Sequence, residues 1–225
     1  MDLSQWIELN PTINIVRSTK KFYGSYPYKL TYRVVGAYLL PICKDLDYIF
    51  KRLYNSVRTK PTKQDHATIE VFFDLYVDKS NGIKWRTEGS TVSLFFEDEQ
   101  TAYGIASGAL LSSVSALRSI TRIQNDSDRA VIESGKIIMT KPTEYRYKVI
   151  IREGYRQMQS RQALGKYLQT IRSEIKISDK MLHGMISNYK YFHSCYFYVN
   201  DPKIVSMIAL VAPSLVKHVQ EVVIT

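Results

Sequence analysis

The chain of 225 residues is poor in the residues that define several protein classes. Its two cysteines, Cys43 and Cys195, lack the CxxC spacing and the companion histidines of a metal site or redox motif. With 10 glycines and 7 prolines, the chain cannot be collagen-like, and two cysteines cannot form a disulfide scaffold. The composition is that of an ordinary globular protein, and no cofactor or metal is expected.

Long apolar runs are also missing. The longest mostly apolar stretch, residues 204–216, is interrupted by Ser206, Pro213 and Ser214, and it is shorter than the roughly 20 residues of a membrane-spanning helix. The first ten residues, MDLSQWIELN, lack the basic and then apolar pattern of a secretory signal peptide. We therefore expect a cytoplasmic, intracellular protein with no membrane partner, and association with a virion is compatible with this location.

Motifs of the common enzyme classes are absent from the sequence. There is no GxGxxG, P-loop, GxSxG or HExxH motif, and the four histidines are scattered. Asp98 and Asp201 each follow a strand-like run and precede an apolar helix pattern, where aspartate is a usual helix N-cap, and Pro202 suits the first helical position. We therefore assign no catalytic residues and favour a non-enzymatic protein.

Positive charge is abundant and unevenly distributed. The chain has 31 Lys and Arg against 21 Asp and Glu, which gives a net charge of +10. The excess lies in residues 13–63 and 141–190, and the rest of the chain is net acidic. Such basic blocks are typical of proteins that bind a polyanion.

The two basic blocks begin in similar segments, which indicates an internal duplication. Each of these segments is followed by a helical pattern with apolar residues at i, i+3, i+4 and i+7, then by a strand-like run, an aspartate, an apolar helix pattern and a closing aliphatic run. The matched segments are STKKFYGSYPYKLTYRVV (18–35) with MTKPTEYRYKVIIR (139–152), TVSLFFEDEQTAYGIASGALL (91–111) with SCYFYVNDPKIVSMIALVAPS (194–214), and SITRI (119–123) with EVVIT (221–225).

Each copy is predicted to have the order strand, helix, strand, strand, helix, strand, which is the ferredoxin-like split βαβ topology. The second strand is predicted at 66–78 in the first copy, where HATIEVFFDLYVD is rich in β-branched and aromatic residues, and at 174–178 in the second. Additional strands are predicted at 13–17 and 136–140, ahead of the two units.

The predicted fold class is therefore α+β, with two tandem ferredoxin-like units. The first unit covers residues 1–123 with its N-terminal extension, an exposed polar linker covers 124–135, and the second unit covers 136–225. RRM-type RNA-binding domains use the same topology, and KYFHSCYFYV (190–199) resembles their signature faintly, without the glycine after the leading basic residue. The resemblance to RRM domains is one of fold, not of family membership.

One face of such a sheet packs under helices and the other is uncovered, so side chains along a strand alternate between core and open face. On the open face we expect lysines and arginines in the first strands to contact phosphates, and aromatic residues in the third strands to stack on bases. Lysines beside the FYGSYP loop (22–27) and next to Tyr191 and Phe192 extend this surface. The residues predicted to bind nucleic acid are Lys20, Lys21, Lys29, Arg33, Phe95, Arg146, Lys148, Arg152, Lys190, Tyr196 and Tyr198.

These features predict a protein that binds single-stranded RNA or DNA. A second interpretation is a structural or assembly protein, such as a virion component or a subunit of a larger complex, whose aromatic faces bury against other copies. The 17 tyrosines suit either use, because tyrosine is favoured at interfaces.

A third interpretation is a metal-independent ribonuclease that uses His183 or His193 as a general base. Tandem ferredoxin-like modules resemble the RNA-processing proteins of CRISPR systems, some of which cleave RNA with a histidine. The Gly-rich C-terminal loop of that family is missing here, because no glycine follows Gly184.

Overall fold

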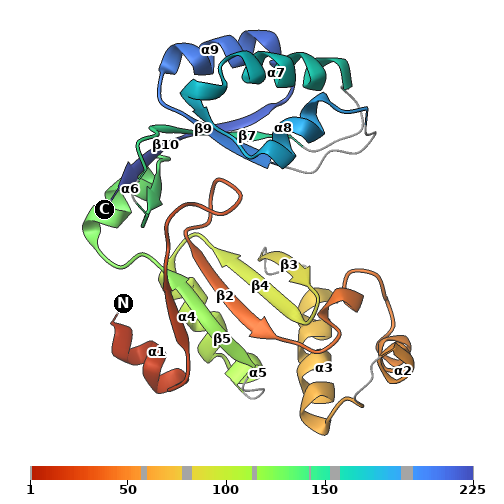
Figure 1. The fold of residues 1–225 in the computed structure, drawn as a ribbon. Helices are drawn as coiled ribbons and strands as arrows, with labels where there is room; N and C mark the ends of the chain where they lie inside the picture. Colours follow the sequence, from red (N-terminus) through yellow and green to blue (C-terminus); the bar gives the residue numbers. More distant parts are fainter. Residues whose placement is uncertain are drawn as a thin grey trace. The chain divides into compact units, whose positions relative to one another are not determined.

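The computed structural model describes residues 2–56, 60–77, 83–112, 116–141, 143–152, 158–188 and 195–224 (Figure 1). The chain divides into two compact units, Met1–Arg129 and Ala130–Thr225. The first unit contains α1 (Leu3–Leu9), β1 (Asn14–Arg17), β2 (Tyr28–Arg33), η1 (Ala37–Leu39), α2 (Leu46–Ser56), α3 (Lys63–Val77), β3 (Lys84–Glu88), β4 (Thr91–Phe96), α4 (Glu99–Ser107), α5 (Ala109–Ser112) and β5 (Leu117–Arg122). The boundary between the units falls in α6 (Asp126–Glu133). The second unit then contains β6 (Ile137–Met139), β7 (Tyr147–Ile151), α7 (Met158–Thr170), η3 (Arg172–Glu174), β8 (Ile175–Lys176), α8 (Asp179–Ile186), β9 (Cys195–Val199), α9 (Pro202–Val211) and β10 (Val216–Ile224).

The two sheets have the same strand order. The first is β1-β5-β2-β4-β3 and the second is β6-β10-β7-β9-β8. The leading strands β1 and β6 pair parallel to β5 and β10, and every other pair is antiparallel. The chain therefore consists of two similar α+β units, each with a five-stranded mixed sheet, as the sequence repeat predicts.

The predicted alternation between core and open face is confirmed in the central strands. Tyr28, Leu30 and Tyr32 of β2 are buried, whereas the intervening side chains are partly or fully exposed. In the second unit, the buried strand residues pack against apolar side chains of α7, α8 and α9, and Figure 1 shows α7 and α9 along one side of that sheet. The strand residues in this core are Val149, Ile151, Phe197 and Val199.

The strand predicted at 66–78 is wrong, because residues 66–77 belong to helix α3, and residue 78 lies outside the described residues. Thr62 and Asp65 exchange N-terminal capping hydrogen bonds, with the Thr62 N–H 2.8 Å from Asp65 Oδ2 and the Asp65 N–H 3.1 Å from Thr62 Oγ1. The buried side chains Thr68, Ile69 and Phe72 follow helical spacing, and Phe72 packs edge-on against Tyr32. Capping and tertiary packing therefore outweigh the β propensity of the segment, and the second strand is formed instead by β3.

The segment predicted as an exposed linker forms α6 over much of its length. Ile132 is fully buried, and Asp128 is 1% exposed and accepts two hydrogen bonds from Arg17, at 2.8 and 2.6 Å. The predicted exposure is therefore wrong for these two side chains. Asp128 ties the start of α6 to strand β1 of the first unit.

The two aspartates predicted as helix caps have that role. Asp98 accepts a hydrogen bond from the Thr101 N–H at 2.7 Å, and Asp201 accepts one from the Lys203 N–H at 2.8 Å. Pro202 occupies the first turn of α9. Within the described ranges, no helix has the length and apolar character needed to cross a membrane.

Candidate nucleic-acid interface

The two sheets carry an equivalent row of side chains on the face opposite their buried strand residues. In each row an aromatic residue, on β4 in the first sheet and on β9 in the second, is paired with a lysine on each of the two neighbouring strands. Directly paired residues point to the same face of a sheet. The rows are Lys29–Phe95–Lys84 across β2, β4 and β3, and Lys148–Tyr198–Lys176 across β7, β9 and β8.

We call the second row together with Tyr196 the Tyr196 site. Tyr196 is 51% exposed, and its ring meets the Tyr198 ring edge-on at a centroid distance of 5.6 Å. Lys148 Nζ lies 4.0 Å from the centroid of Tyr196 and 5.9 Å from that of Tyr198. Burial, and then the neighbouring Tyr196, raise the pKa of Tyr198. The site therefore presents an exposed aromatic ring next to an ammonium group.

Phe95 is buried, although the sequence predicts that it is exposed. It points to the open face, but Phe22 and Tyr23 from the preceding loop cover it and leave it 4% exposed. Lys29 Nζ lies 5.3 Å from the Phe22 centroid, and Lys84 Nζ lies 5.1 Å from that of Tyr23. The first unit therefore presents Tyr23, and not Phe95, to solvent.

Lys29 is partly buried in a cluster of cations. Burial lowers the pKa of its ammonium group, and the charges of Lys20 and Arg86 lower it further. Among the described residues, no carboxylate forms an ion pair with Lys20, Lys29 or Lys84. Arg86 forms an exposed ion pair with Glu88 at 3.1 Å, so the lysines are the like charges on this surface that a bound anion would neutralise.

The remaining predicted residues are dispersed. Arg33 and Arg152 have exposed side chains at the ends of β2 and β7. Arg146 lies 3.2 Å from Glu221 and 5.4 Å from the Tyr147 centroid, so part of its charge is already compensated. Lys20 is exposed and Lys21 partly buried beside the 22–27 loop, and Lys190 lies outside the described residues.

Sequence reasoning missed Lys84, Lys176 and Tyr23. Lys176 was detectable, because Ile175 and Ile177 on either side are buried and alternation places the lysine on the opposite face. Lys84 was missed because the second strand was predicted at 66–78, whereas the structure forms it at β3, which begins with Lys84. Tyr23 lies in the FYGSYP loop, which the sequence places beside the predicted surface, but it is not among the predicted binding residues because its contact with Phe95 depends on how that loop folds over the sheet.

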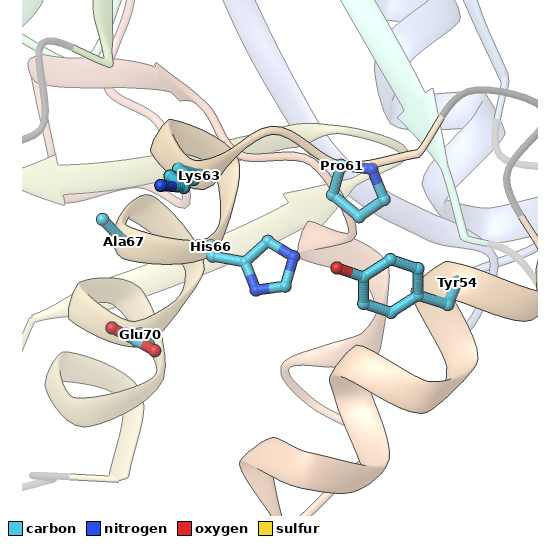
Figure 2. Close-up of a pocket in the computed structure, with 6 residues that line it drawn as sticks. All are labelled: Tyr54, Pro61, Lys63, His66, Ala67 and Glu70. Carbon is cyan, nitrogen blue, oxygen red and sulfur yellow. The ribbon is translucent and has the colours of Figure 1, made fainter.

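A separate cavity of about 430 Å³ lies in the first unit beside α2 and α3 (Figure 2). His66 stacks on Phe50 at 4.5 Å, its Nε2 is buried without a partner among the described residues, and Figure 2 shows the Tyr54 hydroxyl pointing toward its ring. Lys63 and Glu70 bring opposite charges to the lining. No group of three or more potential metal ligands occurs in the described part of the chain. The mixed lining favours no particular ligand class.

Comparisons of the chain with protein-family models, with curated proteins and with solved structures find no match. A functional interpretation therefore depends on the chemistry of the two sheet faces.

Proposed function

We propose that the protein binds single-stranded RNA or DNA without catalysing a reaction on it, and that the Tyr196 site is its principal contact. The observation that carries this proposal is the half-exposed ring of Tyr196 with an ammonium group 4.0 Å from its centroid. Stacking surfaces beside cations are the features that sequence-tolerant single-strand binders use.

Binding would replace one contact of Lys148 with two new ones. An exposed cation–π contact is worth about 0.5–1 kcal/mol, whereas a base stacked on an aromatic ring contributes about 1–3 kcal/mol. The lysine side chain has a flexible four-carbon stem, so its ammonium group can move from the ring to a phosphate while a base takes its place. Lys176, exposed on the far side of Tyr198, is placed for a second phosphate.

We further propose that each unit is ferredoxin-like and that the two arose by duplication. The order β5-β2-β4-β3, with antiparallel neighbours and helices between β2 and β3 and between β4 and β5, supports this for the first unit. The order β10-β7-β9-β8 supports it for the second. In this topology one sheet face remains free of helices, as a stacking platform requires.

The ribonuclease interpretation gains no support from the described histidines. His183 is exposed on α8, whose Met181 and Met185 pack on the core side of the second sheet, away from the face that carries Tyr196. His193 lies outside the described residues. Self-association through the aromatic faces remains the competing account, and the oligomeric state distinguishes it from nucleic-acid binding.

The test is the affinity of a labelled 20-nucleotide single strand for the Tyr196→Ala variant, measured by fluorescence anisotropy. We expect a loss of about 5- to 160-fold, which corresponds to the stacking contribution of about 1–3 kcal/mol from one base. Tyr196→Phe keeps the ring and should bind almost as the wild type does. Tyr48→Ala is a matched control, because Tyr48 is 46% exposed with Arg52 over its ring but lies on helix α2. Equal affinity of Tyr196→Ala and Tyr48→Ala would contradict the proposal.

A further inference from the structure

The first unit presents an exposed tyrosine beside Phe95, although strand β4 itself contains no tyrosine. When the two sheets are compared strand by strand, Phe95 of β4 corresponds to Tyr198 of β9, and Ser93 corresponds to Tyr196. Strand β4 therefore lacks the exposed ring that Tyr196 provides on β9. Tyr23 supplies a ring from the loop before β2. It is 56% exposed and stands edge-on to Phe95 at 5.0 Å, as Tyr196 stands edge-on to Tyr198 at 5.6 Å.

Each exposed ring also has a lysine near it, although the two lysines come from opposite ends of their rows. Lys84 lies 5.1 Å from the Tyr23 centroid, and Lys148 lies 4.0 Å from that of Tyr196. Each of these lysines is the cross-strand partner of the aromatic residue beneath the exposed tyrosine. The two units therefore reach a similar arrangement with tyrosines from different parts of the fold.

The loop holds Tyr23 in an unfavourable backbone conformation. Its φ of 53° lies in the left-handed region, and it is the one non-glycine residue with a positive φ among the described residues. Reciprocal hydrogen bonds between the backbones of Phe22 and Tyr26, at 2.7 and 3.0 Å, close the loop, and Gly24 completes the turn at φ 83°. Strain of this kind at a bulky residue is typical of positions kept for function.

We propose that Tyr23, Lys29, Lys84 and Arg86, which we call the Tyr23 site, form a second binding site for a nucleotide of a single strand. This inference rests on the proposed function. A base stacks on Tyr23, and the phosphates on either side of it contact Lys84 and the cluster of Lys29 and Arg86. The chain is then bivalent, and a strand long enough to reach both sites binds more tightly than a short one because its second contact is intramolecular.

The experiment is an NMR titration of the ¹⁵N-labelled full chain with a trinucleotide, because amide signals report each site separately. We expect shift changes at Lys29, Lys84 and Arg86 as well as at the Tyr196 site. Tyr23→Gly, which accepts the positive φ without strain, should lose the changes at the Tyr23 site and keep those at the Tyr196 site. Tyr23→Phe should keep both sets. Affinity for a 20-nucleotide strand should fall on the order of 10-fold in Tyr23→Gly.

The outcomes separate this inference from the proposed function. Shift changes confined to the Tyr196 site, with wild-type affinity for the long strand in Tyr23→Gly, overturn the second site and leave the proposed function standing. Changes confined to the Tyr23 site support the inference and contradict the Tyr196 site as principal contact. No change at either site overturns both.

Discussion

At the scale of single residues, Lys29 shows how a binding surface can reduce stability. Its pKa is lowered by burial and by the charges of Lys20 and Arg86. At pH values between the folded-state pKa of Lys29 and its higher pKa in the unfolded chain, the unfolded chain therefore binds more protons than the folded protein. Over that alkaline interval the stability contributed by this residue rises with pH, whereas at neutral pH its full unfavourable contribution is present.

We predict that Lys29→Met stabilises the first unit and weakens nucleic-acid binding. The gain in free energy of unfolding should be up to about 0.5 kcal/mol, as is usual for surface substitutions. The loss of one phosphate contact should reduce the slope of log affinity against log salt by about 0.7 for a single strand. Urea unfolding and salt-dependent anisotropy measure the two effects. Lys44→Met, an exposed lysine outside both sites, should change neither, and a destabilised Lys29→Met would contradict the argument.

Asp128 is a residue on which stability should depend strongly. It is 1% exposed and accepts two hydrogen bonds from Arg17, so removal of its charge takes away the carboxylate that compensates a partly buried guanidinium. We predict that Asp128→Asn lowers the free energy of unfolding of the first unit by about 3 kcal/mol. Asp126→Asn changes the same residue type in the same helix, where the side chain is fully exposed, and should cost less than about 0.5 kcal/mol. Similar urea midpoints for the two variants would refute this role.

At the scale of elements, two helical glycines should respond in opposite ways to alanine. A Cβ at Gly165 of α7 would lie 2.9 Å from Ile186 Cγ1 and 3.0 Å from Met185 Cβ of α8, whereas one at Gly104 of α4 would meet nothing within 4 Å. Gly165→Ala should therefore destabilise the second unit by about 1–3 kcal/mol through overpacking. Gly104→Ala should stabilise the first unit by up to about 1 kcal/mol through helix propensity. Native-state hydrogen exchange measures each unit separately, and an unchanged second unit in Gly165→Ala would show that α7 and α8 are not in close contact.

Elements that depend on local sequence patterns could be predicted from the sequence. The repeat, the alternation in β2 and the caps of α4 and α9 depend on local patterns, and all of these were predicted. Helix α3 was not, because its β-branched and aromatic composition favours a strand, whereas the Thr62–Asp65 cap and the packing of Phe72 on Tyr32 favour the helix. Since β3 was then misplaced, its Lys84 could not be assigned to the site.

Prediction of the site failed where it depended on contacts across the fold. Lys148, Tyr196 and Tyr198 lie on neighbouring strands of one face, so alternation alone placed them together. Phe95 follows the same rule, yet its exposure depends on the loop of Phe22 and Tyr23, which folds back over β4. Local periodicity contains no information about such a cover.

At the scale of the whole molecule, the basic blocks of the sequence correspond to two similar units that each present lysines beside an exposed tyrosine. A strand that contacts the four lysines of the two rows should show a slope of log affinity against log salt of about −3, at about 0.7 per phosphate. Assembly through the same faces predicts a different behaviour, because burial of the aromatic faces between copies would produce a concentration-dependent oligomer that is indifferent to nucleic acid.

The most direct test of the central claim is fluorescence anisotropy of labelled single-stranded RNA and DNA titrated with the wild-type protein at two salt concentrations, with light scattering on the same sample. Our account predicts binding at low salt that weakens as salt increases, by a protein that remains small on its own. No binding at low salt, together with a defined oligomer, would contradict it and favour assembly.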